Sequence, residues 1–276
     1  MRKIIFILLP ALMAVSCNLG PRGEYYSIKG FTQGTSYRIT YQHPFESDLQ
    51  AEIDTLLRHF DLSLSTYEPA SIISGINSNR EGVETDSMFR TVFREAARVY
   101  QITGGAFDIT LGPVINAWGF GPGDQQDVDS AMIDSLLQYV GMDKVQLEGK
   151  RLVKTHPGLT LNVNAIAQGY AVDVVCAYLE ELDCANYMVE IGGEIRTRGV
   201  NPKGSYWRIG VDRPDLGNMI PGQSLQVIIS MKDRSLATSG NYRKYYEKDG
   251  VMITHSIDPA TGFPRESRLL LSLIHI

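Results

Sequence analysis

Alternating hydrophobic and polar residues predict several strands along the chain. In TSYRITY, residues 35–41, the side chains of Thr35, Tyr37, Ile39 and Tyr41 share one face, because successive residues of a strand point to opposite sides. The same alternation recurs in YMVEI at 187–191, WRIGV at 207–211, LQVIISM at 225–231 and VMITHSI at 251–257. VQLEGKRLVKT at 145–155 predicts a hairpin about Gly149, LTLNVN at 159–164 a further strand, and Asp249–Gly250 a turn.

Hydrophobic residues with a helical period predict four helices. Residues 47–60 carry one apolar stripe, and Ser47 and Gln50 have the spacing of a capping box at its start. The second helix is expected from Asp86 to Thr103, ending before Gly104–Gly105. The third covers 129–141, ending at Gly141, and the fourth covers 165–182.

Strands and helices mix without a regular βαβ rhythm, and no linker or repeat divides the chain. This order favours an α+β domain with a mixed or antiparallel sheet and packed helices over a doubly wound parallel fold. The 276 residues include 43% hydrophobic residues, enough for a proper core.

Charge and cysteine content exclude two classes of protein. The net charge of −5 supplies no basic field for nucleic acid. Cys176 and Cys184 match no zinc-site spacing, so we expect two buried or half-buried thiols.

The first seventeen residues, MRKIIFILLPALMAVSC, resemble a bacterial lipoprotein signal. Arg2 and Lys3 form a positive start, and residues 4–15 form an apolar stretch too short for a membrane span. Cys17 then stands where such signals place the lipidated cysteine. We expect an exported inner-membrane lipoprotein that faces the periplasm, with a plain secretory signal as the alternative.

One helix start is suggestive of an anion site. In NVNAIAQG, residues 162–169, two asparagines lead directly into the helix expected at 165–182. Free backbone N–H groups and the helix dipole favour negative charge at such a start, and a diphosphate suits it. No P-loop and no G-x-G-x-x-G accompanies it, which excludes a standard nucleotide-binding fold.

Several glycine-rich and polar segments, taken in order, resemble the ApbE family of FAD:protein FMN transferases. They are GTSY at 34–37, STYEPAS at 65–71, GGAFDITLGP at 104–113, NAWGFG at 116–121, GYAVD at 169–173, GGE at 192–194, TSGNY at 238–242 and HSIDPATGFP at 255–264. The GGAFD and HSIDPATG stretches are long enough to be specific. The resemblance implies signal residues 1–17 and one flavin transferase domain over 18–276.

The resemblance implies a reaction in which FAD is split, FMN passes to a threonine hydroxyl of a partner protein, and AMP is released with the help of Mg²⁺. The implied partner is a subunit of a membrane redox complex. Two alternatives stay open: hydrolysis of FAD to FMN and AMP by the same site, and a flavin-binding lipoprotein without catalysis.

The resemblance also assigns residues. It places Tyr67 against a flat ring of FAD, and Ala106, Phe107 and Asp108 along the FAD pocket, with Asp108 as a hydrogen-bond acceptor. The Ala165 backbone would touch the metal. The remaining FAD-binding residues are Gln33, Asn162, Gln168, Gly192, Gly193, Glu194 and Ile257.

His255 is the candidate catalytic residue, either as general base for the acceptor hydroxyl or as an electrostatic partner of the diphosphate. Asp258 and Thr261 are expected to hold the turn that follows it. For His255 taken alone, a structural histidine is the more common interpretation, and the surrounding motif reverses that preference.

The sequence departs from the family pattern at three positions. Gln33 replaces a methionine, Asn162 an aspartate, and Gln168 a lysine or glutamate. All three can still hydrogen-bond, but the charge beside the diphosphate changes. Family members also continue past the TG-x-P turn to an aspartate and a threonine that bind the metal, so we expect RESRLLLSLIHI to be a truncated tail and metal binding by these 276 residues to be weak.

Overall fold

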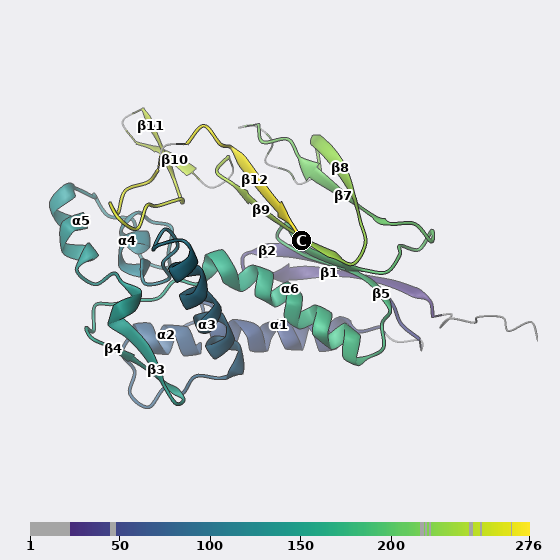
Figure 1. The fold of residues 1–276 in the computed structure, drawn as a ribbon, viewed down its shortest axis with the longest axis horizontal. Coiled ribbons are helices and arrows are strands. Elements are labelled where there is room, and N and C mark those ends of the chain that lie inside the picture. The colour runs from purple at the N-terminus through teal and green to yellow at the C-terminus, as the bar shows by residue number, and fades with distance from the viewer. Residues whose placement is uncertain are drawn as a thin grey trace, which may run out of the picture.

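The computed structural model describes residues 23–44, 48–215, 218, 220, 222–242, 245–248, 250–265 and 267–276 (Figure 1). Its main sheet has six antiparallel strands in the spatial order β1 (Tyr25–Thr32), β2 (Thr35–Gln42), β5 (Asn186–Ile191), β6 (Glu194–Arg198), β9 (Arg234–Gly240) and β12 (Leu271–His275). Three two-stranded sheets accompany it: β3 (Val145–Glu148) with β4 (Arg151–Lys154), β7 (Trp207–Asp212) with β8 (Leu225–Met231), and β10 (Tyr245–Lys248) with β11 (Val251–Thr254).

The described residues also form α-helices. They are α1 (Gln50–Leu64), α2 (Ile72–Asn77), α3 (Ser87–Ile102), α4 (Gly112–Ala117), α5 (Ser130–Leu137) and α6 (Asn164–Glu181), with a short 3₁₀ turn, η1, at Met142–Lys144. None of the helices in the described part of the chain combines the length and hydropathy that a membrane span requires.

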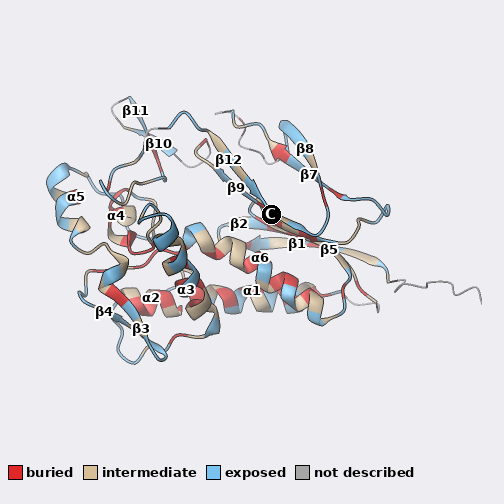
Figure 2. Cartoon of the chain, viewed as in Figure 1, coloured by how far each residue is buried: buried red, intermediate tan, exposed pale blue. Residues whose placement is uncertain are grey.

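The main core lies between the sheet and the helices α1 and α6, which run side by side (Figures 1 and 2). Tyr37, Ile39 and Tyr41 of β2 are buried and face it, as the alternation in TSYRITY predicts. Ile53 and Phe60 of α1 are buried on the opposite side of the same core. Burial of large apolar side chains on both layers fixes the register of β2 and the rotation of α1.

A second, smaller core supports the region around residue 255. Leu111, Val114, Trp118, Ile133 and Ile253 are buried together. Val114 lies in α4, and Leu111 and Trp118 flank its two ends, while Ile133 comes from α5 and Ile253 from β11. This cluster therefore joins α4 and α5 to the β10–β11 hairpin.

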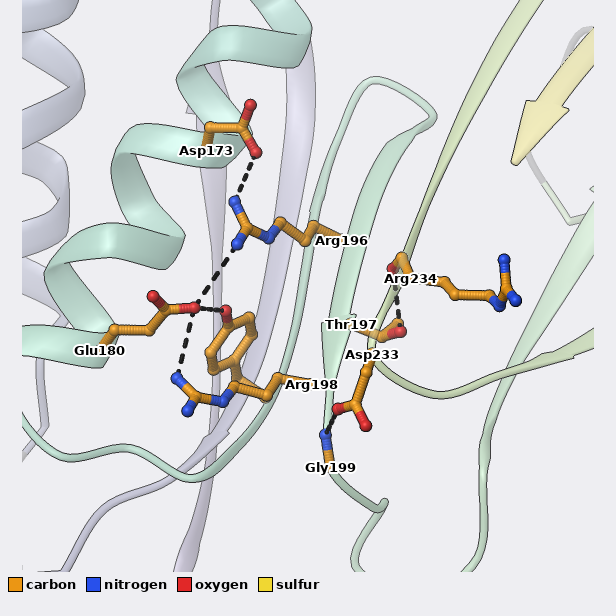
Figure 3. A network of polar contacts seen from close by, with 9 residues as sticks. Asp173, Glu180, Arg196, Thr197, Arg198, Gly199, Asp233 and Arg234 are labelled. Carbon is orange, nitrogen blue, oxygen red and sulfur yellow. Dashed lines mark hydrogen bonds and ion pairs between the residues drawn. The ribbon is translucent and has the colours of Figure 1, made fainter. Parts of the chain in front are cut away.

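A polar network ties α6 to the sheet on the outside of the main core (Figure 3). Arg196 donates to Asp173 at 2.8 Å and lies 3.6 Å from Glu180, which also pairs with Arg198 at 3.4 Å. Tyr187 donates a hydrogen bond to the same Glu180 carboxylate. These ion pairs are half-exposed, and they fix α6 against β5 and β6 more through geometry than through large energies.

The α+β class is confirmed, and so are most predicted elements. The strands at 187–191, 207–211 and 225–231, the hairpin about Gly149 and the helices at 86–103 and 165–182 all form. Asp86 caps α3 by accepting from the Phe89 backbone N–H. Cys176 and Cys184 are buried free thiols, as expected.

Other predicted elements are wrong or shorter. The capping box is wrong, because α1 begins at Gln50 with Leu49 at its N-cap, and Ser47 lies outside the described residues. LTLNVN is not a strand: its one ladder contact is the isolated parallel bridge between Thr160 and Leu111. The third helix ends at Leu137, before Gly141. Asp249 of the expected turn and Cys17 of the expected signal also lie outside the described residues.

The strand predicted at 251–257 ends at Thr254. His255 therefore follows β11 instead of continuing its face, and Ile257 makes only an isolated bridge to Pro264.

Candidate active site

The turn between β1 and β2 meets the start of α6 and the β5–β6 turn. Gln33 has a positive φ of 51° at the tip of the β1–β2 hairpin, and Gly192 has one of 58° between β5 and β6. A Cβ on Gly192 would lie 2.3 Å from Gln168 Nε2 and 2.7 Å from Thr35 Cγ2. Glycine is therefore required at 192 both by its conformation and by close packing, and the structure brings Gln168 and Gly192 together.

The Gly192–Gly193 turn is held by side chains on both sides. The Gly193 backbone N–H donates to Glu190 Oε1 at 3.2 Å, and the Gly193 carbonyl accepts from Thr238 Oγ1 at 3.2 Å. Thr238 belongs to the TSGNY segment, so two of the motif segments meet at this turn.

Glu194 begins β6 directly after this turn. Burial raises the pKa of its carboxyl from 4.5 to about 7, and a backbone hydrogen bond from Thr238 opposes part of that rise. The Glu194 carboxyl is thus about half protonated near neutral pH. It is able either to accept or to donate a hydrogen bond to a ligand at the turn.

The GGAFD segment forms a tight loop after α3. Gly104 and Gly105 have positive φ angles of 59° and 86°, which end the helix as predicted. Asp108 Oδ1 accepts from the backbone N–H of Thr110 at 2.7 Å and from its hydroxyl at 2.6 Å. Burial raises the pKa of Asp108, while these bonds from Thr110 lower it. One carboxylate oxygen of Asp108 therefore shapes the loop, and the other is the one left for a ligand.

Asn162 connects this loop to α6. Its backbone N–H donates to the Ile109 carbonyl at 2.7 Å, and its Oδ1 accepts from the Asn164 N–H at 3.0 Å. Ala165 lies exposed in the first turn of α6, and its N–H has no hydrogen-bond partner among the described residues. This helix start presents a free donor and the positive end of the helix dipole, which suits an anion.

Tyr67 and His255 converge on Phe120. The Tyr67 hydroxyl donates to the Phe120 carbonyl at 3.3 Å, and its side chain is 59% exposed. The His255 ring lies edge-on to the Phe120 ring, with centroids 6.2 Å apart. Phe120 belongs to the NAWGFG motif, for which no role was predicted. Only the fold reveals that it links the two.

The turn after His255 is held by several hydrogen bonds. The Asp258 carbonyl accepts from Gly262 N–H at 2.7 Å, and its Oδ1 accepts from Ala260 N–H at 2.9 Å. Thr261 Oγ1 accepts from Phe263 N–H at 3.3 Å, so the predicted turn-holding role of Asp258 and Thr261 is confirmed. Trp118 Nε1 donates to the Gly262 carbonyl at 2.8 Å, which anchors the turn to the second core.

Asp61 is a half-buried acid with no role predicted from the sequence. Thr32 Oγ1 donates to Asp61 Oδ2 at 3.5 Å, which joins the β1–β2 hairpin to the last turn of α1, shortly before Tyr67. Burial raises the pKa of Asp61. The buried atoms Asp61 Oδ1, Gln33 Nε2 and Thr66 Oγ1 have no protein hydrogen-bond partner within the described residues. Such unpaired buried groups are expected where a polar ligand completes the hydrogen bonding.

A divalent metal fits the described residues poorly. They contain no group of three or more histidine, cysteine, aspartate or glutamate side chains placed to hold an ion. Mg²⁺ requires nearly octahedral oxygen ligation, and the only predicted ligand, the Ala165 backbone, supplies one carbonyl.

Known proteins similar to this chain agree with the resemblance. The ApbE family model matches residues 33–274. A curated protein from Vibrio cholerae serotype O1, named FAD:protein FMN transferase, is 39% identical and aligns with 98% of this chain and 81% of its own length. The one from Haemophilus influenzae, with the same name, is 33% identical over the same shares.

Solved structures agree as well. The flavin transferase ApbE from Vibrio cholerae superposes with a TM-score of 0.81 at 38% identity, covering 92% of this chain and 82% of that one. The apo flavinyl transferase ApbE from Pseudomonas stutzeri gives a TM-score of 0.80 at 33% identity, covering 92% and 80%. With matches of this extent in sequence and in structure, the chain belongs to the ApbE family.

Proposed function

We propose that this protein is a FAD:protein FMN transferase that moves FMN from FAD to a threonine hydroxyl of an acceptor protein. Family membership and the two named relatives support the reaction class. The observation that carries the assignment to this site is the convergence of Tyr67 and His255 on Phe120. An exposed aromatic ring and an imidazole in one place are suited to hold a flat ring and to accept a proton.

The proposed reaction transfers the FMN phosphoryl group of FAD to the threonine oxygen. The threonine oxygen forms a bond to the FMN phosphorus of FAD, and the bond from that phosphorus to the bridging oxygen breaks. The electron pair stays on the AMP phosphate, which leaves. The hydroxyl proton passes to the His255 imidazole, whose exposed position after β11 leaves it accessible to an incoming protein segment.

Binding of FAD is assigned to the remaining site residues. The α6 start, with the free Ala165 N–H, faces the diphosphate, and the second oxygen of Asp108 accepts from an amine or hydroxyl of FAD. The Gly192–Gly193 turn permits close approach of the backbone. The unpaired Gln33 amide and Asp61 carboxylate offer further polar contacts.

Mg²⁺ belongs to the proposal as an expected cofactor. The described residues contain no group of three or more histidine, cysteine, aspartate or glutamate side chains that could hold it. Its requirement is tested directly: EDTA abolishes transfer and added Mg²⁺ restores it if the metal is needed.

The decisive experiment incubates the protein with FAD and an acceptor subunit of a membrane redox complex. Intact-mass spectrometry measures FMN on the acceptor, and chromatography measures free AMP and FMN. An acceptor with its threonine changed to valine is the matched control. FMN on the threonine acceptor alone supports the proposal. Free FMN plus AMP without labelling means a FAD pyrophosphatase, and unchanged FAD means a flavin-binding protein without catalysis.

The proposal also includes anchoring at the periplasmic face of the inner membrane through lipidated Cys17. The n-region, the short apolar stretch and the cysteine at its end support it. Cys17→Ala is expected to release the exported protein from the membrane fraction or leave it unprocessed. Unchanged membrane association of that variant would refute the anchor.

A further inference from the structure

A pocket that shares no lining residue with the set assigned to FAD is formed by the end of α2, the loop after it, strand β4 and the residues that follow β4. Its volume is about 360 Å³, within the range of small-molecule sites. Four basic side chains line it, Arg80, Arg151, Lys154 and His156, and none of its lining residues is acidic. We call it the basic pocket.

Lys154 is a half-buried cation in this pocket. Its Nζ donates to the carbonyl oxygens of Ile76 and Leu159, both at 2.9 Å. Within the described part of the chain it forms no ion pair, and burial lowers the pKa of its ammonium group. An ammonium group has three N–H donors, so one is left for a ligand. An anion in the pocket would compensate this charge.

His156 presents a fixed donor. Its Nδ1 accepts from the Gly158 backbone N–H at 2.9 Å, which places the proton of the neutral ring on Nε2. The ring stacks on Tyr139, with centroids 4.4 Å apart and an angle of 22° between the planes. The orientation of the Nε2–H group is therefore set before any ligand arrives.

The two arginines add planar donors. Arg80 donates to the Pro69 carbonyl at 2.8 Å through one Nη, which leaves most of its five N–H groups uncommitted. Arg151 is exposed, and its side chain forms no ion pair or hydrogen bond with any described residue. Guanidinium groups bind phosphate in a bidentate manner.

Apart from Asn79, whose amide donates to the Pro157 carbonyl at 3.1 Å, the rest of the pocket is apolar. Ile76 is only 7% exposed, and Val83 lies half-buried beside it. A ligand that fills the pocket therefore needs an anionic head for the basic side chains and an apolar body for this floor.

We infer that the basic pocket binds a small phosphomonoester with an apolar or aromatic body, at a site separate from the one assigned to FAD. The four basic side chains hold the phosphate, and Ile76 and Val83 contact the body. Binding of this ligand at the basic pocket does not depend on FMN transfer.

The test uses phenyl phosphate as the probe, titrated into the full chain by calorimetry at low ionic strength. Wild-type protein is expected to bind it, and to bind inorganic phosphate at least several-fold more weakly because phosphate lacks the apolar body. Arg151→Gln is expected to weaken phenyl phosphate binding by roughly fivefold, the effect of one unit charge about 4 Å away in water. Adding His156→Gln is expected to weaken it further.

Arg208→Gln is the matched control, since Arg208 is an exposed arginine on β7 and the change in charge is the same. It should leave binding unaltered. The inference is wrong if wild type does not bind the probe, if Arg151→Gln binds as wild type does, or if both arginine variants lose affinity equally. It is also wrong if saturating FAD displaces the probe, because the two sites would then be one.

Discussion

The hydroxyl of Tyr67 and the backbone carbonyl of Phe120 are joined by a 3.3 Å hydrogen bond across 53 residues of sequence. Tyr67 follows α1, and Phe120 follows α4. The bond holds the exposed Tyr67 side chain at the segment whose Phe120 ring contacts the His255 ring. The position of this ring therefore depends on a backbone atom, not on the Phe120 side chain.

Tyr67→Phe removes the hydrogen bond to the Phe120 carbonyl but keeps the aromatic ring. Because the bond is exposed, its loss is expected to weaken FAD binding by no more than about 1 kcal/mol, whereas Tyr67→Ala also removes the ring and should weaken it further. FAD fluorescence titration measures both. Tyr206→Ala, at another exposed tyrosine, should leave FAD affinity unaltered. Equal affinity in wild type and Tyr67→Ala would remove Tyr67 from the FAD site.

Asp108 is expected to contribute to the stability of the fold as well as to FAD binding. Asp108→Ala removes the acceptor of two Thr110 bonds, and the Thr110 hydroxyl in turn accepts from Gly141 N–H at 2.7 Å. The free energy of unfolding should fall by about 1–3 kcal/mol, measured by urea denaturation. Asp108→Asn keeps an acceptor and should restore most of it, while still altering FAD affinity.

Asp134→Ala, at an exposed position on α5, is the control. If Asp108→Ala is as stable as this control, the carboxylate does not hold the loop. If both Asp108 variants bind FAD as wild type does, Asp108 is structural only.

The sequence predicted the main core better than it predicted the site. Tyr37, Ile39 and Tyr41 alternate within one strand, so a local pattern was enough to place them. LTLNVN was misassigned because its neighbour in space is the segment at Leu111, which supplies one bridge instead of a ladder. Alternation in that stretch reflects burial of Leu159, Leu161 and Val163, not strand pairing.

The site residues missed by sequence analysis depend on contacts between distant segments. Phe120 has a role only because Tyr67 and His255 reach it from the segments that follow α1 and β11. Asp61 sits on the last turn of α1 and looks like an ordinary polar helix residue until Thr32 is placed against it. No local pattern carries either relationship. By contrast, the positive φ angles at Gly104, Gly105 and Gly192 follow from glycine itself.

Glu194 should make stability depend on pH. Its pKa rises from 4.5 in the unfolded chain to about 7 in the folded protein, so folding favours the protonated form. That stabilisation is complete below pH 4.5 and is lost as the pH rises through 7. Glu194→Gln is neutral throughout, so its stability relative to wild type should increase over this window. Solvent screening of a half-buried group limits the gain to about 1–2 kcal/mol.

Urea denaturation of both proteins at several pH values between 4.5 and 7.5 measures the difference. Glu81→Gln, at an exposed position, should show no such trend. A difference between Glu194→Gln and wild type that stays constant with pH would mean that the carboxyl titrates at its ordinary value.

His255 is the residue on which the proposed chemistry depends most. It lies exposed beyond the end of β11 and contacts the Phe120 ring, while the turn after it is held by Asp258, Thr261 and Trp118 without its help. His255→Ala should therefore fold normally and bind FAD nearly as wild type does. Loss of a general base should nevertheless slow FMN transfer by roughly 10²–10⁴-fold.

The control is His59→Ala, at an exposed histidine on α1, which should transfer FMN at the wild-type rate. The measurement is the rate of acceptor labelling under saturating FAD, with its pH profile: a base in the wild type gives a rise in rate with pH that His255→Ala lacks. Near-normal transfer by His255→Ala, or an unchanged pH profile, would return His255 to a structural role and leave the proton acceptor to be sought among Asp61, Asp108 and Glu194, whose burial raises their pKa values.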